Sequence, residues 1–196
     1  MKISLFRGYT DCVKNCTSAE AVNREGLFGE NGFMLACKNG YTDIVEYILE
    51  KDYFKHLLNG IHLIENKTGF YWACANGHVK VVEALLNERS GRINYNVVGS
   101  EGLSGYLVAF EKGHTDLVKL LLETSIFKFN FKEKENVESV KSQTAFILAC
   151  KNGHKGWYQY LLVKGNSSHF IFVCQFHVHN ICLYSGRAAC NHFPIA

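Results

Sequence analysis

The segment Ala73-Cys74-Ala75-Asn76-Gly77-His78 decides the fold of this chain, because it recurs along the sequence. Two close copies read Ala36-Cys37-Lys38-Asn39-Gly40-Tyr41 and Ala149-Cys150-Lys151-Asn152-Gly153-His154, and a looser copy reads Ala109-Phe110-Glu111-Lys112-Gly113-His114. Aligned on their glycines, the successive copies lie 37, 36 and 40 residues apart. A period of this length indicates stacked supersecondary units rather than one closed globule.

Each copy predicts a short first helix that ends at the repeated glycine. Nine residues before the glycine stands a small polar residue whose side-chain oxygen can cap the helix N-terminus, namely Asn31, Thr68, Ser104 and Thr144. A glycine or alanine follows, then an aromatic residue, an apolar pair and a fixed alanine, whose small side chain lets a partner helix come close. The closing glycine ends the helix because it adopts the left-handed conformation at little cost.

A second helix is expected to begin two residues after each glycine. Its apolar residues form one stripe at helical spacing: Ile44, Val45, Ile48 and Leu49; Val81, Val82, Leu85 and Leu86; Leu117, Val118, Leu121 and Leu122. Thr42 and Thr115 are candidate capping hydroxyls, and an aspartate after each suits the positive end of the helix dipole. One helical hairpin cannot bury such a stripe alone, so neighbouring units are expected to stack.

These motifs resemble the ankyrin repeat. The family pattern Thr-Pro-Leu-His-x-Ala-Ala-x-x-Gly-His matches Thr68 and Thr144, the four repeated glycines, and His78, His114 and His154. Its proline is missing from every copy, and its first histidine is replaced by Met34, Tyr71, Leu107 and Ile147. The resemblance implies an all-α solenoid of helix-turn-helix units joined by hairpin-like loops. The replaced histidines remove a hydrogen bond that ties consensus repeats together, so a looser array is expected.

The repeats also predict the domain organisation. An ankyrin-repeat domain is expected over residues 1–165, with a half-repeat at 1–30 and repeats at about 31–67, 68–103, 104–143 and 144–165. Residues 166–196 form a divergent tail rich in cysteine, histidine and aromatic residues. The connections between repeats are long, and residues 52–58 are apolar enough to form an extra helical turn.

Composition and charge argue against several classes of protein. The net charge of +3 and the isoelectric point near 8.4 are too mild to indicate a nucleic-acid-binding protein. No stretch approaches the ~18–20 apolar residues of a membrane-spanning helix, and residues 1–7 lack the hydrophobic run of a signal peptide. We therefore expect an intracellular monomer, cytoplasmic or nuclear, that binds neither nucleic acid nor membrane.

Five of the eight cysteines fall on core positions of the repeats, namely Cys12, Cys16, Cys37, Cys74 and Cys150. Cysteine packs there as a small hydrophobic residue, so reduced thiols are favoured over disulfides. The tail contains Cys174-x-x-His177 and His179-x-x-Cys182, whose spacings also occur at zinc sites. No second Cys-x-x-Cys pair accompanies them, so an aromatic segment beside the last repeat is favoured, and no metal or cofactor is assigned.

Signals for catalysis are missing. The sequence lacks a phosphate-binding loop, a dinucleotide-binding fingerprint, a His-Glu-x-x-His zinc motif and a Gly-x-Ser-x-Gly nucleophile elbow. His78, His114 and His154 each occupy the same place in a repeat, which is typical of an architectural role. Each is expected to hydrogen-bond across the turn between its own two helices. The chain is therefore interpreted as non-enzymatic.

A protein-binding surface is the remaining candidate site. In the ankyrin family, finger-like hairpins and the exposed side of the first helices form a concave groove. The matching first-helix positions here are Lys38, Asn39, Ala75, Asn76, Glu111, Lys112, Lys151 and Asn152. They vary between copies, as a partner-selecting surface does, although any solvated helix face also varies. Three functions remain open: a scaffold or adaptor, a regulatory fragment of a larger protein (including an enzyme), and a metal-binding tail on a repeat spacer.

Overall fold

The computed structural model describes residues 26–88, 91–124 and Asn152 of the 196-residue chain. The chain divides into two compact units, residues 1–109 and 110–196. The first unit contains helices α4 (Gly32–Asn39), α5 (Thr42–Glu50), α6 (Gly69–Ala75) and α7 (Val79–Leu86), and a 3-10 helix, η1 (Asp52–Leu57). Helix α8 (Gly105–Lys112) crosses the unit boundary, and α9 (Thr115–Glu123) belongs to the second unit.

The described residues contain no β-strand, and their one bridge pairs Val98 with Ser104. The predicted all-helical repeat fold is confirmed for this part of the chain. The half-repeat at 1–30, apart from its last residues, lies outside the described residues. So do the tail at 166–196 and most of the fourth repeat, and the predicted domain boundaries stay predictions.

The first helices begin with side-chain caps, as the sequence indicates. Oδ1 of Asn31 accepts a hydrogen bond from the backbone N–H of Met34 at 2.8 Å, and Oγ1 of Thr68 accepts one from that of Tyr71 at 3.2 Å. Ser104 differs, because its buried hydroxyl has no hydrogen-bond partner among the described residues. The predicted cap at Ser104 is therefore not formed.

Glycine follows Thr68 and Ser104, at places where successive first helices lie very close together. A Cβ added to Gly69 would lie 2.9 Å from Cε1 of Phe33 and 3.1 Å from Sγ of Cys37. A Cβ on Gly105 would lie 2.9 Å from the Cα of Tyr71. The fixed alanines Ala36 and Ala73 are fully buried in the same layer, as expected of small residues at a close helix contact.

The second helices bury most of the predicted apolar stripe, but Leu49 and Leu122 are only half-buried. Ile44, Val45 and Ile48 are buried on α5, and Val81, Val82, Leu85 and Leu86 are buried on α7. In the second unit, α9 buries Leu117, Val118 and Leu121. The prediction of threonine caps was wrong: α5 and α9 start at Thr42 and Thr115 themselves, after Tyr41 and His114, and neither helix has a side-chain cap.

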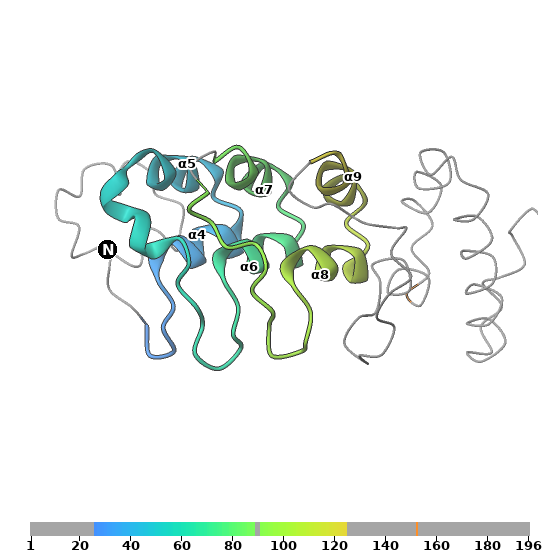
Figure 1. Cartoon of the computed structure of the whole chain (residues 1–196), viewed down its shortest axis with the longest axis horizontal. Helices are drawn as coiled ribbons and strands as arrows, with labels where there is room; N and C mark the ends of the chain where they lie inside the picture. The colour runs from blue at the N-terminus through green and yellow to red at the C-terminus, as the bar shows by residue number, and fades with distance from the viewer. Residues whose placement is uncertain (1–25, 89–90, 125–151, 153–196) are drawn as a thin grey trace, which may run out of the picture. The chain divides into compact units, whose positions relative to one another are not determined.

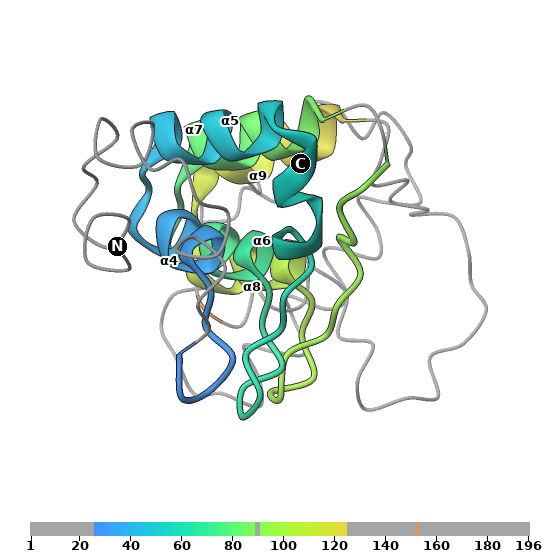
Figure 2. The ribbon, with the colours of Figure 1, turned by 90° about the vertical axis from the view of Figure 1, so that its left-hand side faces the viewer.

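The helices of the first unit form two layers (Figure 1). Helix α4 packs against α6 in one layer, α5 packs against α7 in the other, and each first helix contacts the second helix of its own repeat. The view along the stack shows the same two layers with hairpin loops extending beyond α4 and α6 (Figure 2). Stacking therefore completes a core that no single hairpin could bury.

Three hairpin loops, here called fingers, comprise residues 26–30, 61–67 and 98–103. The backbone N–H of Leu63 donates to the carbonyl of Phe28 at 2.8 Å, which joins the first finger to the second. The N–H of Ser100 donates to the carbonyl of Glu65 at 2.8 Å, which joins the second finger to the third. The fingers thus lie side by side in repeat order.

The long connection after α5 contains the extra helical turn that the sequence predicts at residues 52–58, as the 3-10 helix η1. Phe54, Leu57 and Leu58 are buried there. Arg92 fastens this connection to the next one, because its guanidinium donates to Oδ1 of Asp52 at 3.1 Å and to the carbonyl of Leu49 at 3.0 Å.

Candidate functional site

The predicted partner-facing positions differ in exposure. Asn39, Asn76, Lys112 and Asn152 are exposed, whereas Lys38, Ala75 and Glu111 are half-buried; Lys151 lies outside the described residues. Lys38 and Asn39 end α4, Ala75 ends α6 just before Asn76, and Glu111 and Lys112 end α8.

Two of these asparagines connect adjacent repeats. Nδ2 of Asn76 donates to the carbonyl of Lys38 at 2.7 Å, and Nδ2 of Asn152 donates to the carbonyl of Glu111 at 3.1 Å. The two bonds join equivalent positions. Each asparagine directly precedes the glycine of its own repeat, and each acceptor stands two residues before the glycine of the preceding repeat. Asn76 and Asn152 therefore help to hold the stack together in addition to facing solvent.

The histidine of the second repeat makes a different bond from the one expected. Nε2 of His78 lies 3.0 Å from the carbonyl oxygen of Lys38, 40 residues earlier, so the nitrogen donates to the preceding repeat. The prediction that His78 bridges the turn between its own two helices was wrong. Its ring also covers Gly40, since a Cβ on that glycine would lie 2.6 Å from Nδ1 of His78.

Two lysine ammonium groups of the first unit lie near the ring of Trp72 on α6. Nζ of Lys38 lies 4.0 Å from the centroid of this ring, and Nζ of Lys67 lies 4.8 Å from it. Ammonium groups at these distances are attracted to the ring face. The predicted residue Lys38 is therefore held against Trp72.

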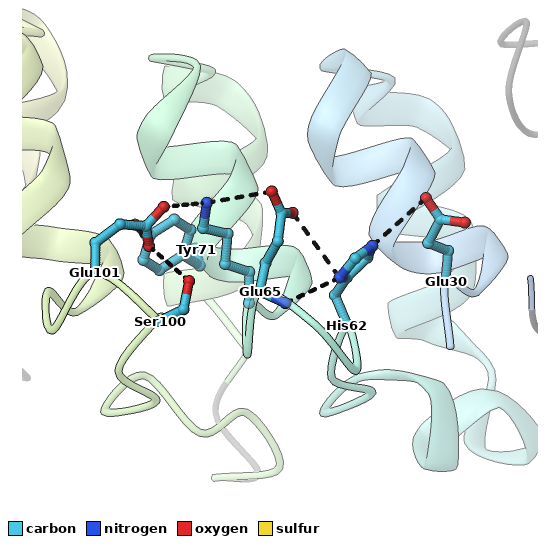
Figure 3. Close-up of polar contacts among 7 residues, drawn as sticks. Glu30, His62, Glu65, Tyr71, Ser100 and Glu101 are labelled. Atoms are coloured by element: carbon cyan, nitrogen blue, oxygen red, sulfur yellow. Dashed lines mark hydrogen bonds and ion pairs between the residues drawn. The ribbon is translucent and has the colours of Figure 1, made fainter. Parts of the chain in front are cut away.

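Lys67 is the centre of a charge network that joins the second and third fingers. Figure 3 labels its partners Glu65 and Glu101. Nζ of Lys67 donates to Oε1 of Glu101 at 2.6 Å and lies 3.7 Å from Oε1 of Glu65. The hydroxyl of Tyr71 donates to the other oxygen of Glu101 at 3.3 Å. The lysine is buried, with 9% of its side chain exposed, so its charge requires these partners.

His62 links the first finger to the second. Its Nδ1 accepts a hydrogen bond from the backbone N–H of Glu65 at 3.2 Å, so in the neutral ring Nε2 carries the proton. That nitrogen points toward Glu30, 3.9 Å from its Oε1 (Figure 3). The ring also lies beside Phe28, with 5.9 Å between ring centroids.

The network lowers the pKa of Glu101. Burial works to raise this pKa, but the hydrogen bond from Lys67, a backbone hydrogen bond, the positive charge of Lys67 and the Tyr71 hydroxyl together outweigh it. Glu101 is therefore ionised throughout the neutral range and can balance the buried ammonium.

None of these finger residues was predicted from the sequence, although their spacing in the sequence could have indicated them. Glu30, Glu65 and Glu101 lie 35 and 36 residues apart, close to the repeat period. Phe28, Leu63 and Val98 lie 35 residues apart in the same segments. Aligning the loops as well as the helices would have revealed an apolar residue followed by a glutamate in each finger.

The described cysteines are free thiols with buried side chains, as predicted for Cys37 and Cys74. Burial raises the pKa of both thiols well above the ordinary value. Cys12, Cys16, Cys150 and the cysteines and histidines of the tail lie outside the described residues. Within residues 26–88 and 91–124, no group of three or more metal-binding side chains comes together.

No helix in the described part of the chain is both long and apolar enough to cross a bilayer.

A search of curated proteins found no match to the sequence. A family model for ankyrin repeats matches residues 1–98 with three copies. This match covers half of the chain, and the caps, the glycine turns and the two-layer stack of helical hairpins agree with it. The chain therefore belongs to the ankyrin-repeat family.

Proposed function

We propose that this chain is a non-catalytic scaffold or adaptor that holds a partner protein against its first helices and fingers. Ankyrin repeats are in general protein–protein interaction modules. The observation that carries the proposal is the arrangement of the first unit. In consecutive repeats, α4 and α6 end beside the exposed Asn39 and Asn76, and the same helices carry the half-buried Lys38 and Trp72. Ala36 and Ala73 of these helices are buried in the core.

The positions proposed to touch the partner are those at the ends of the first helices. They are Lys38, Asn39, Ala75 and Asn76 in the first unit, and Glu111, Lys112, Lys151 and Asn152 in the second. Their chemistry differs from repeat to repeat, as expected of a surface that selects a partner. The proposal also includes a monomer that acts inside the cell, in the cytoplasm or nucleus, where thiols such as Cys37 and Cys74 stay reduced.

The proposal of a non-catalytic role has support from the ionisable groups of the first unit. The thiolate is the reactive form of cysteine, and burial keeps Cys37 and Cys74 protonated at neutral pH. Lys67, His62 and their glutamate neighbours are bonded to one another across the fingers. These groups thus act as structural links.

Affinity capture with the full chain, followed by titration of the purified pair, tests this proposal. Charge reversal at Lys38, Glu111 or Lys112 should weaken the complex. The melting temperature should stay nearly unchanged for the exposed Lys112, whereas reversal at the half-buried Lys38 also removes its contact with Trp72. Matched reversals at Glu46 and Glu83, exposed on α5 and α7, should not affect affinity. The opposite pattern would place the working surface on the second helices and contradict the proposal.

A further inference from the structure

The exposed apolar side chains of the described residues gather on the fingers. Leu27, Leu63 and Ile64 are 94%, 74% and 64% exposed, and Phe28, Ile61 and Val98 are also exposed. Tyr53, on η1, is the other large apolar residue of this kind in the described part of the chain. Single exposed apolar residues are ordinary, but a cluster of them on adjoining loops marks an interaction surface.

The fingers that carry these apolar residues are bonded to one another. The N–H of Leu63 donates to the carbonyl of Phe28, and its side chain lies against Gly29, where an added Cβ would be 3.1 Å from Cγ of Leu63. Nδ2 of Asn66 donates to the carbonyl of Val98 at 2.7 Å. An apolar strip therefore runs across three successive repeats of the first unit.

Carboxylates accompany the strip at the period of the repeat. Glu30, Glu65 and Glu101 are each at least partly exposed, whereas Lys67, the one lysine of the fingers, is buried beneath them. Three carboxylates and one lysine leave the fingers with a net charge of −2 when His62 is neutral. The whole chain carries +3, so this local negative charge is opposite in sign to that of the molecule.

We propose that the apolar strip of the fingers binds an extended segment of a partner protein that combines apolar side chains with lysine or arginine. This inference rests on the proposed function and adds the chemistry of the partner. The apolar side chains of the segment cover Leu27, Leu63 and Ile64. Glu30 and Glu65 receive its cations, since their contacts to His62 and Lys67, at 3.9 and 3.7 Å, are longer than the 2.6 Å between Lys67 and Glu101.

Electrostatic complementarity of this kind selects partners and orients them, while burial of the apolar side chains supplies most of the affinity. A segment with the same apolar residues but acidic neighbours would place like charges against Glu30 and Glu65. The strip therefore discriminates by sign of charge as well as by hydrophobicity.

Selection of random peptides displayed on phage against the full chain tests this inference. The selected peptides should carry apolar residues and a net positive charge. Synthetic versions are then titrated in three forms: as selected, with glutamate replacing each lysine or arginine, and with serine replacing each apolar residue. Both altered forms should lose binding.

The surface is located with variants of the chain. Leu63→Ser and the double variant Glu30→Gln/Glu65→Gln should each weaken binding of the selected peptide by about tenfold, as expected for residues at the centre of an interface. Tyr53→Ser is the matched control, because Tyr53 is 50% exposed but lies outside the fingers. It should leave the affinity unchanged. Circular dichroism confirms that every variant retains its helices.

Enrichment of acidic peptides, no enrichment at all, or unchanged affinity after Leu63→Ser would each overturn the inference. If the selected peptides instead lose binding with Lys38→Glu while the finger variants bind normally, the strip is not the site and the proposed interaction function still stands. Loss of the captured partner with reversals on α5 and α7 would contradict the proposed function itself, independently of the peptides.

Discussion

Nζ of Lys67 lies 2.6 Å from Oε1 of Glu101, two residues on successive fingers that are 34 positions apart in the sequence. The pair joins a buried cation to a carboxylate that is 52% exposed. Tyr71 and Trp72 on α6 flank the ammonium, whose Nζ is 5.2 Å and 4.8 Å from their ring centroids. One side chain thus connects two fingers and a first helix, which fixes the surface on which the proposed binding depends.

Replacing Lys67 with methionine should destabilise the fold by about 1–2 kcal/mol, because a charge-assisted hydrogen bond is lost and Glu101 is left without its main partner. A double-mutant cycle with Glu101→Gln should give a coupling free energy of about 1 kcal/mol in urea unfolding. The exposed pair Lys119–Asp116, 3.4 Å apart on α9, is the control and should give about 0.5 kcal/mol or less. Equal coupling for the two pairs would mean that Lys67 is not a structural link.

Gly40→Ala should be more harmful than the same change at Gly102. Both glycines have positive φ, 74° and 80°, so alanine is strained at either position by about 1–2 kcal/mol. Only at Gly40 would the new methyl group meet an obstacle, the ring of His78, whereas nothing lies within 4 Å at Gly102. The difference in unfolding free energy should be about 1–3 kcal/mol. If both variants lose the same amount, His78 does not pack over Gly40 as described.

Asn76→Ala should cost about 1 kcal/mol of stability, because the carbonyl of Lys38 loses one of its two inter-repeat donors. Asn39→Ala is the matched control, since the side chain of Asn39 bonds to Leu35 within its own helix and is exposed. Chemical denaturation gives the free energy of unfolding of each variant, and the two values compare the bond between repeats with the bond within one helix. A larger loss for Asn39→Ala would show that the bond across repeats contributes little.

The stability of the chain should fall in acid partly because of Glu101. Its pKa is lowered in the folded state relative to the ordinary value of 4.5, so its ionised form stabilises the fold above that value. This contribution is lost as the pH falls below 4.5 and through the folded pKa. The difference in unfolding free energy between the native chain and Glu101→Gln should be constant near neutral pH and should shrink below 4.5. A constant difference down to the acid limit would contradict the pairing with Lys67.

Cys37 and Cys74 should resist alkylation in the folded chain at neutral pH. Burial raises the pKa of both thiols, so they stay protonated at neutral pH. Burial also keeps the reagent from reaching them. Iodoacetamide labelling followed by mass spectrometry should modify these two cysteines only after denaturant is added. Rapid labelling of Cys74 in buffer would show that the interface between α4 and α6 opens readily.

Much of the fold was predictable because its determinants are local. The caps at Asn31 and Thr68 follow from residue type and a fixed distance to the glycine, and the stripe on α7 follows from helical spacing. The cap expected at Ser104 was not formed: its hydroxyl is buried without a hydrogen-bond partner among the described residues. A local sequence pattern shows that a residue can form a cap, and the packing around it decides whether the bond is made.

The site was less predictable because its contacts join different repeats. The acceptor for His78 is the carbonyl of Lys38 in the preceding repeat, and only the stacking register brings the two together. The link between Lys67 and Glu101 depends on the same register. The first-helix positions came from family resemblance, whereas the fingers required the loops to be aligned in space.

Hydrogen–deuterium exchange of the full chain, alone and bound to the partner protein captured with it, tests the central claim most directly. Binding at the proposed face should slow exchange in residues 26–30, 61–67 and 98–103 and at the ends of α4 and α6. Exchange in α5 and α7 should change little. Protection confined to α5 and α7, with the fingers unaffected, would contradict the claim that the first helices and fingers form the binding surface.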